Sequence, residues 1–215
     1  MTEIAIYAEG GGDTTEQKAQ LRQGFDGLLC NSKSSARAKR LGWKVVPCGG
    51  RQAAYDAFIN AVHSNPAAVN VLLVDSETLV KANAGGVTQD PAVCVAHLTQ
   101  QDNWNLREVQ AERVHLMAQC METWIVADPA ALEKFYGKKF ASKDLPSRIL
   151  LEEEPKRDVY DKLAKATRET QKGEYHEIRH ASQLLQKIDP TKVAQRCPRF
   201  AILTCWLDGT IEACR

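Results

Sequence analysis

The segment Asn70–Glu77 constrains the fold most, because it is an apolar run that ends in two carboxylates, Asp75 and Glu77. Its centre, Val71–Val74, is continuous and rich in β-branched side chains, which is typical of a strand buried on both faces of a parallel sheet. In open α/β sheets the ligand crevice lies beyond the carboxyl ends of the strands. We therefore expect Asp75 and Glu77 at that crevice.

The two carboxylates lie two residues apart, so in an extended chain both side chains face the same way. Two negative charges at one spot repel each other unless a cation lies between them. One interpretation is a Mg²⁺ site, since Mg²⁺ prefers one or two carboxylates together with waters and substrate phosphates. The other is a strand-end acid pair that caps the next helix or faces solvent. An isolated D-x-E pattern favours this second interpretation.

Two further segments place acids where strands are expected to end. Glu3–Ala8 is a second short apolar run, and Glu9 follows it directly. Arg113–Cys120 predicts another strand, and Glu122 lies in the first turn of a helix expected over residues 121–137. Because the carboxyl ends of parallel strands meet at one edge of a sheet, the acids at these ends are expected to converge. This convergence strengthens the interpretation as a metal site.

The first half of the chain alternates strand and helix patterns. A helix is expected over residues 14–29, a strand over Trp43–Pro47 and a second helix from Arg51 onward. The resulting βαβαβ order requires right-handed crossovers and a parallel sheet. The glycines at positions 10–12 allow a tight turn, but the turn is neither G-x-G-x-x-G nor a Walker A loop, so nucleoside triphosphate binding is not expected.

The overall expectation is an α/β fold in which a parallel sheet flanked by helices occupies residues 1–140. Residues 141–215 are expected to form a mostly helical extension packed on it, because their patterns are charged and helical. The segment 78–104, with its Gly-Gly and Asp-Pro pairs, is expected to be a long loop over the site.

Several basic side chains are candidates for phosphate binding. Arg51 is expected at the carboxyl end of a strand, where a guanidinium can bind a phosphate through two parallel hydrogen bonds; a surface salt bridge is the alternative. The segment YHEIRH, residues 175–180, formally contains the zinc motif H-E-x-x-H. A cationic arginine between the ligand positions and the lack of a third ligand argue against zinc. We interpret His176, Arg179 and His180 as phosphate-binding donors, with a polar surface helix as the alternative.

Composition narrows the class of protein. The chain has 215 residues, of which 28 are basic and 27 acidic, so its net charge of +1 does not indicate a uniformly basic nucleic-acid-binding surface. Its seven cysteines are scattered and never spaced as C-x-x-C, which argues against a disulfide framework and a zinc ribbon. Free thiols, the absence of a signal-peptide pattern and the absence of a membrane-spanning run favour a cytoplasmic protein.

A glutamate after the first strand and an acidic pair after the third resemble Toprim domains, which occur in topoisomerases, primases and OLD-type nucleases. The motifs EGGGD, CGGR, LLVDSE, HLMAQCMETWIVADP and KGEYHEIRH are similar to a family of small bacterial proteins labelled domain of unknown function 4276. That family is Toprim-related and often encoded beside an AAA-type ATPase. By this resemblance Glu9 matches the Toprim glutamate, Asp75 and Glu77 match the metal pair, and Glu122 matches an acid that helps to hold a second metal. The metal pair of Toprim domains has Asp at its second position. Glu77, whose side chain is longer, therefore departs from the family pattern.

The resemblance implies a Mg²⁺- or Mn²⁺-dependent phosphodiesterase or nuclease in bacterial antiphage defence, acting on DNA or tRNA together with an AAA-type ATPase. In it, Glu9, Asp75 and Glu77 would be catalytic and would hold metal with Glu122. A different class stays open: a non-catalytic adaptor or regulatory subunit of that ATPase, since a fold does not give a function. Phosphotransfer from an aspartyl nucleophile fits less well, because the first strand is followed by Glu9. The sequence leaves open whether the chain forms homo-oligomers.

Overall fold

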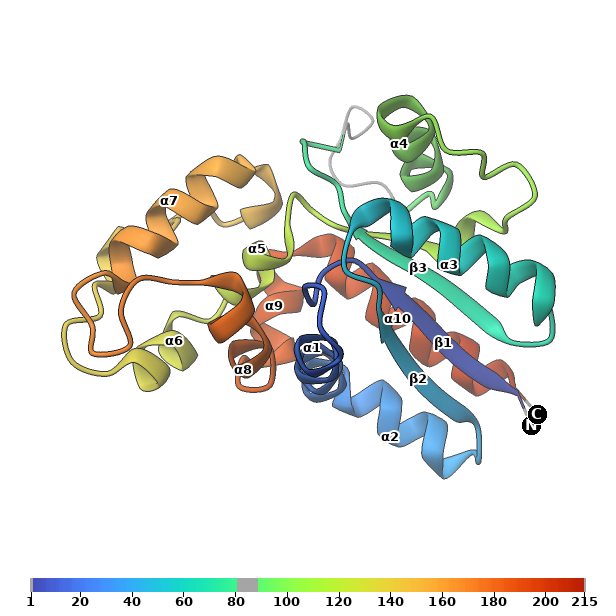
Figure 1. Ribbon diagram of the computed structural model, residues 1–215, viewed down its shortest axis with the longest axis horizontal. Helices are drawn as coiled ribbons and strands as arrows, with labels where there is room; N and C mark the ends of the chain where they lie inside the picture. The colour runs from blue at the N-terminus through green and yellow to red at the C-terminus, as the bar shows by residue number, and fades with distance from the viewer. Residues whose placement is uncertain (1, 81–88, 215) are drawn as a thin grey trace.

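The computed structural model describes residues 2–80 and 89–214 (Figure 1). In this part of the chain one sheet of four parallel strands has the order β2-β1-β3-β4, which confirms the expected α/β class. Strand β1 therefore lies between β2 and β3, and β4 pairs with β3 at one edge. The strands are β1 (Glu3–Ala8), β2 (Gly42–Pro47), β3 (Val69–Asp75) and β4 (Val114–Met117).

Alternate side chains of the strands enter two hydrophobic cores on opposite faces of the sheet. Ile4 and Ile6 share one core with helices α1 (Thr15–Leu28) and α10 (Pro198–Ala213). Leu72 and Val74 share the other core with α3 (Arg51–Ser64) and α4 (Ala92–Asp102). All four of these strand side chains are fully buried. This two-sided burial explains the continuous apolar runs in the sequence.

The first helix follows directly from the sequence after the glycine turn. Thr14 and Gln17 form a capping box, in which each side chain accepts a hydrogen bond from the backbone N–H of the other at 3.2 Å. The expected helix over residues 14–29 is thus confirmed within one residue at each end. Helix α2 (Cys30–Ala38) then leads into β2.

The expected long loop over residues 78–104 is wrong in part, because α4 begins at Ala92. Asp90 and Pro91 start this helix: Asp90 Oδ1 accepts a hydrogen bond from the backbone N–H of Ala92 at 2.9 Å. Cys94 and Leu98, four residues apart, then pack against the sheet. The Asp-Pro pair is therefore a helix start and not a turn within a loop. Residues 81–88 of the expected loop lie outside the described residues.

The segment after β4 also differs from expectation. The strand expected over residues 113–120 is shorter, and the single helix expected over residues 121–137 is two helices, α5 (Met121–Ile125) and α6 (Pro129–Tyr136). Asp128 and Pro129 cause the break, since Asp128 caps α6 by accepting from the backbone N–H of Ala131 at 3.3 Å.

The C-terminal helices pack on the sheet domain and share its larger core. Leu163, Leu184, Val193 and Leu207 come from four different helices and belong to the same hydrophobic cluster as β1 and α1. Within the described residues, no helix is long and apolar enough to cross a membrane. The helices are α7 (Lys156–Thr167), α8 (Ser182–Leu185), α9 (Pro190–Arg196) and α10.

Candidate functional site

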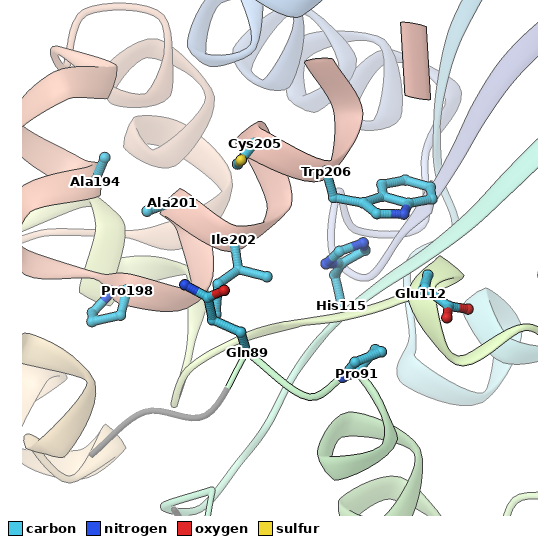
Figure 2. Close-up of a pocket in the computed structure, with 10 residues that line it drawn as sticks. All are labelled: Gln89, Pro91, Glu112, His115, Ala194, Pro198, Ala201, Ile202, Cys205 and Trp206. Atoms are coloured by element: carbon cyan, nitrogen blue, oxygen red, sulfur yellow. The ribbon is translucent and has the colours of Figure 1, made fainter. Parts of the chain in front are cut away.

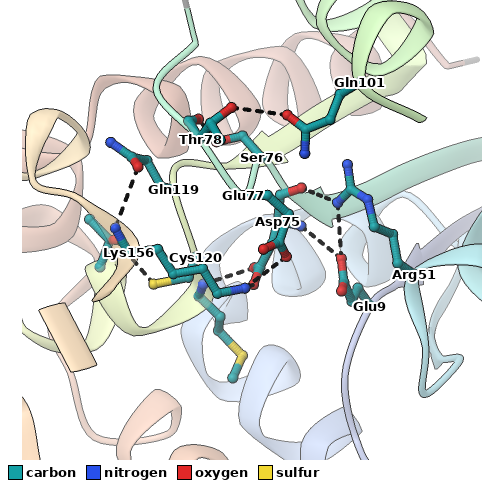
Figure 3. A network of polar contacts seen from close by, with 12 residues as sticks. Glu9, Arg51, Asp75, Ser76, Glu77, Thr78, Gln101, Gln119, Cys120 and Lys156 are labelled. Carbon is teal, nitrogen blue, oxygen red and sulfur yellow. Dashed lines mark hydrogen bonds and ion pairs between the residues drawn. The ribbon is translucent and has the colours of Figure 1, made fainter. Parts of the chain in front are cut away.

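Three acids predicted from the sequence meet at the carboxyl ends of β1 and β3 (Figure 3). Glu9, Asp75 and Glu77 each bring one carboxylate oxygen to within 4.8 Å of the others. Asp75 is buried, and the other two are partly buried. Strands β1 and β3 are hydrogen-bonded neighbours, which is why acids 66 residues apart in sequence share one place.

Backbone groups hold Glu9 and Asp75 together. The N–H of Glu9 donates to Leu73 O at 3.0 Å, which continues the β1–β3 ladder by one residue. In return the N–H of Asp75 donates to Glu9 Oε2 at 3.0 Å. The chain then turns away at Gly10, whose φ of 101° suits glycine, and Gly10 pairs with Gly49 after β2. The Glu9 carboxylate is thus fixed by the sheet itself.

Glu77 reaches the site by a different route from the expected one. The sequence argument assumed an extended chain through Asp75 and Glu77, but β3 ends at Asp75 and Glu77 has a φ of 63°. The N–H of Glu77 donates to Gln119 O at 2.9 Å, so the segment after β4 holds this turn in place. The two carboxylates therefore converge because of a backbone turn and not because of strand alternation.

Lys156, at the start of α7, lies against the acidic pair (Figure 3). Its Nζ is 3.1 Å from Asp75 Oδ2 and 2.7 Å from Glu77 Oε1. The second oxygen of Asp75, Oδ1, accepts from the N–H of Met121 at 2.9 Å. Sequence reasoning missed Lys156, because nothing in its local pattern indicates a position about 80 residues from its partners. A cation already lies where the two carboxylates would repel each other.

The pKa values reflect this crowded charge. Burial raises the pKa of Asp75 well above its usual range, and the neighbouring Glu9 raises it further, against the opposing effect of Lys156. Burial also raises the pKa of Glu9, although Arg51 opposes the shift. Burial alone would lower the pKa of Lys156, but the charges of Asp75 and Glu77 outweigh it and raise the pKa. Lys156 therefore stays an ammonium ion while it contacts these acids.

Arg51 is committed to protein acceptors. Its guanidinium forms a bidentate pair with Asp102, at 2.7 Å for both Nε–Oδ1 and Nη2–Oδ2. Nη1 lies 3.3 Å from Glu9 Oε2 and also donates to the backbone oxygen of Asp75. The structure thus places Arg51 beside the predicted acids, where it orients Glu9. Asp102 was missed by sequence reasoning.

A cavity of about 130 Å³ lies next to the three acids, and Glu122 lines it. Glu122 is 1% exposed and lies in α5, and its Oε1 accepts from the hydroxyl of Tyr175 at 2.7 Å. It is not among the three acids whose oxygens lie within 4.8 Å of one another. Burial and the charge of Glu122 raise the pKa of both Tyr175 and Tyr160, so both phenols stay protonated. The cavity is lined by Glu9, Gly10, Gly49, Asp75, Met117, Met121, Glu122, Lys156, Tyr160 and Glu177.

The H-E-x-x-H segment contributes its glutamate to this cavity and not its histidines. Glu177 begins a π-helical turn (Glu177–Ala181), and its pKa is raised by burial and by Glu122. The N–H of His176 donates to His180 Nδ1 at 3.1 Å, and Tyr136 lies 3.2 Å from the same nitrogen. Among the described residues, Glu9, Asp75 and Glu77 form the only group of three or more histidine, cysteine or acidic side chains whose ligand atoms lie within 4.8 Å of one another.

The predicted phosphate-binding residues of this segment lie elsewhere. Arg179 and His180 line a second, larger cavity beside Gln17 and Lys172. His176 is exposed, and His180 is 6% exposed. The structure therefore does not bring these three side chains to the acidic cavity.

The arrangement can hold a hard cation. Its donors are carboxylate oxygens, which Mg²⁺ and Mn²⁺ prefer over softer ligands. Lys156 shows that a positive charge is favourable against Asp75 and Glu77, since its ammonium contacts both. The donor set thus fits a divalent metal, provided that Lys156 gives up one of these contacts.

Comparison with known proteins gives a family and no closer relative. Neither the curated proteins nor the solved structures contain a significant match to the chain. One family model matches residues 8–208 and so covers β3, both acidic strand ends and the C-terminal helices as far as residue 208 in α10. The chain belongs to the family described as Domain of unknown function (DUF4276).

Proposed function

We propose that this chain is a Toprim-type, metal-dependent phosphodiesterase that cleaves DNA or tRNA. The observation that carries the proposal is the convergence of Glu9, Asp75 and Glu77 within 4.8 Å at the carboxyl ends of two neighbouring parallel strands. In an open α/β sheet this edge is where ligands bind. The pKa values of Asp75 and Glu9 are both raised. Carboxyl groups with raised pKa values in such a crevice are typical of a functional site.

Each residue takes a role from its contacts. Asp75 and Glu77 would hold Mg²⁺ or Mn²⁺, which when bound polarises a phosphoryl oxygen and lowers the pKa of a bound water. Glu9 Oε2 already accepts from Asp75 and Arg51, so we assign its other oxygen to metal binding or proton transfer. Glu122, which lines the same cavity, would help to hold a second metal.

Lys156 has two states in this proposal. With its Nζ between Asp75 and Glu77 it neutralises the acids. Released from one of them, it can bind a phosphate oxygen of the substrate, because the ammonium remains in the same cavity. The charge needed beside a phosphodiester is therefore supplied by α7, and not by His176, Arg179 or His180.

The proposal includes a partner. The net charge of +1 gives little long-range attraction for a polyanion, and most non-specific affinity for nucleic acid comes from neutralised phosphates. We propose that an AAA-type ATPase presents the substrate or controls access to it, as the resemblance to Toprim-related defence proteins implies. The system would then act in bacterial antiphage defence.

One observation favours a second candidate, a non-catalytic adaptor of that ATPase. Lys156 already compensates Asp75 and Glu77, so the site is stable without a metal. If Lys156 never leaves, the acids and the lysine are a structural ion cluster that fixes α7 to the sheet. The two candidates differ in whether metal displaces Lys156.

A cleavage assay tests the proposal. DNA and total tRNA are incubated with Mg²⁺ or Mn²⁺ and the chain, with and without the proposed AAA-type ATPase partner. We expect metal-dependent cleavage that Glu9→Ala abolishes and that the exposed control Glu133→Ala retains. Equal activity in both variants, or no cleavage under any of these conditions, would favour the adaptor. Full cleavage by the isolated chain at physiological salt would remove the need for the partner.

A further inference from the structure

The acids of the acidic cavity follow the two inner strands of the sheet, so a strand of nucleic acid bound there can extend toward either edge strand, β2 or β4. At the β4 edge a third cavity, of about 550 Å³, lies between β4 and α10 (Figure 2). Its walls are mostly apolar, with Ile202 and Trp206 among them, and they include the acid Glu112. Such a surface does not attract a polyanion. The β4 edge is therefore poorly suited to phosphate groups.

The β2 edge differs, because the segment that forms it carries no carboxylate. Residues 27–55, which include α2, β2 and the start of α3, contain six basic and no acidic side chains. Asp26 directly precedes them, and both of its oxygens are already engaged. Oδ1 lies 3.0 Å from Trp43 Nε1, and Oδ2 lies 2.8 Å from Lys33 Nζ. This segment therefore has an excess of positive charge that the net charge of +1 conceals.

Lys18, in α1, adds a cation beside a wall of the acidic cavity. A Cβ on Gly49 would lie 3.8 Å from Lys18 Nζ, and Gly49 lines that cavity. Burial raises the pKa of the neighbouring Cys48 thiol, and the charge of Lys18 opposes this shift. Lys18 is partly buried but forms no ion pair within residues 2–80 and 89–214. Its ammonium can therefore bind an anion without giving up a protein carboxylate.

Arg22 places a second cation one helical turn further along α1, which packs against β2 (Figure 1). Lys18 and Arg22 are four residues apart, so their side chains share one face of the helix. Arg22 Nε donates to Val45 O at 3.0 Å, which holds the guanidinium at the β2 edge. Its two terminal nitrogens bind no group in the part of the chain that the structure describes. Glu16 lies on another face of α1, where it lines the cavity that contains Arg179.

We propose that a strand of the nucleic-acid substrate leaves the acidic cavity past Gly49 and follows α1, where Lys18 and Arg22 each bind one phosphate. This inference rests on the proposed function and adds the path of the substrate to it. Lys156 reaches the acids from α7, whereas Lys18 lies beside Gly49, so the two lysines contact different phosphates of the strand. The substrate class that fits this surface is a polymer with several phosphates and not a small phosphate ester.

Binding without cleavage tests this path. A fluorescent single-stranded oligonucleotide is titrated with the full chain in EDTA at low ionic strength, and its anisotropy is measured. We expect Lys18→Gln and Arg22→Gln each to bind it about fivefold more weakly, because each lacks one phosphate contact. For each variant, the slope of the logarithm of affinity against the logarithm of salt concentration should become shallower by about 0.7. Lys18→Arg keeps the charge and should keep the affinity.

Exposed basic residues elsewhere provide matched controls. Lys134→Gln in α6 and Arg107→Gln after α4 should bind the oligonucleotide as the wild type does. Weaker binding confined to the Lys18 and Arg22 variants would support the path even if the cleavage assay shows no activity. Equal binding by these variants and the controls, or no binding by the wild-type chain, would overturn the path even if the chain cleaves nucleic acid. Unchanged oligonucleotide binding with lost binding to the ATPase would also overturn it and assign this surface to the partner.

Discussion

The acidic cavity holds Asp75 against a lysine, whereas β4, at the edge of the sheet, holds His115 as a neutral ring whose Nε2 has no hydrogen-bond partner among the described residues. Burial acts on both side chains and in each case disfavours the charged form. The difference is that Lys156 contacts Asp75 as a counter-charge, whereas the charge of Arg199 adds to the effect of burial on His115. The charge of Asp75 is therefore compensated, whereas His115 avoids a charge by staying neutral.

This difference gives Asp75 and His115 opposite effects of pH on stability. The folded chain holds a proton on Asp75 more tightly than the unfolded chain does, so this contribution to the free energy of unfolding is largest at low pH and falls as pH rises above 3.8. The folded chain holds a proton on His115 less tightly, so its contribution is largest above pH 6.5 and is lost as pH falls toward about 4. Variants at the two positions separate these effects.

The largest expected effect is at His115. Relative to His115→Phe, the wild-type chain should lose about 3 kcal/mol of unfolding free energy as pH falls from 6.5 to below 4, because the buried ring must stay neutral. Urea unfolding at several pH values measures this difference. His63→Phe should show no such change, since its side chain is 62% exposed. A pH-independent difference between wild type and His115→Phe would mean that the ring is not buried as described.

The next effect is at Lys156. Replacing it by Met leaves Asp75 and Glu77 without their shared cation, and we expect a loss of about 2 kcal/mol at pH 7, reduced by the partial exposure of the pair. Adding Asp75→Asn should recover part of this loss. Chemical denaturation of both variants and of the exposed control Lys134→Met measures it. If the double variant is as unstable as Lys156→Met alone, repulsion between the acids is not the cause.

A smaller effect of opposite sign is expected for Asp75→Asn in the metal-free chain. The amide can still accept from Met121 N–H and carries no charge, so the variant should be about 1 kcal/mol more stable at pH 7. The gain should shrink as pH falls from 7 to 4, because the pKa of Asp75 is raised well above its usual range and the folded chain takes up this proton readily. Thermal unfolding across this range, with the exposed Asp56→Asn as control, measures it. A less stable Asp75→Asn at pH 7 would show that the ion pair with Lys156 outweighs burial.

The sheet and half of the acidic cavity could be predicted from the sequence because their signals are local. The apolar runs before Glu9 and Asp75 mark buried parallel strands, and the carboxyl ends of such strands meet at one edge. The capping box at Thr14 marks the first helix in the same way. These features depend on neighbouring residues alone.

The other half of the cavity could not be predicted, because it depends on how distant segments pack. Lys156 and Tyr160 come from α7, and Glu177 comes from a π-helical turn within a segment that resembles a zinc motif. The turn at Glu77 depends on a hydrogen bond to Gln119, which no local pattern encodes. His115 lies within an apolar strand, so only the fold shows that its Nε2 is buried and finds no partner in the part of the chain that the structure describes.

The central claim is that Asp75 and Glu77 bind a divalent metal in place of Lys156. Calorimetric titration of Mn²⁺ into the wild-type chain, Asp75→Asn, Lys156→Met and the control Asp56→Asn tests it most directly. We predict saturable binding to the wild type and the control, affinity reduced by about tenfold or more in Asp75→Asn, and tighter binding in Lys156→Met, where no tethered cation competes. Wild type and Asp75→Asn with the same affinity, or a wild-type chain that binds no Mn²⁺, would contradict the claim and leave Lys156 as the permanent counter-ion of the acidic cavity.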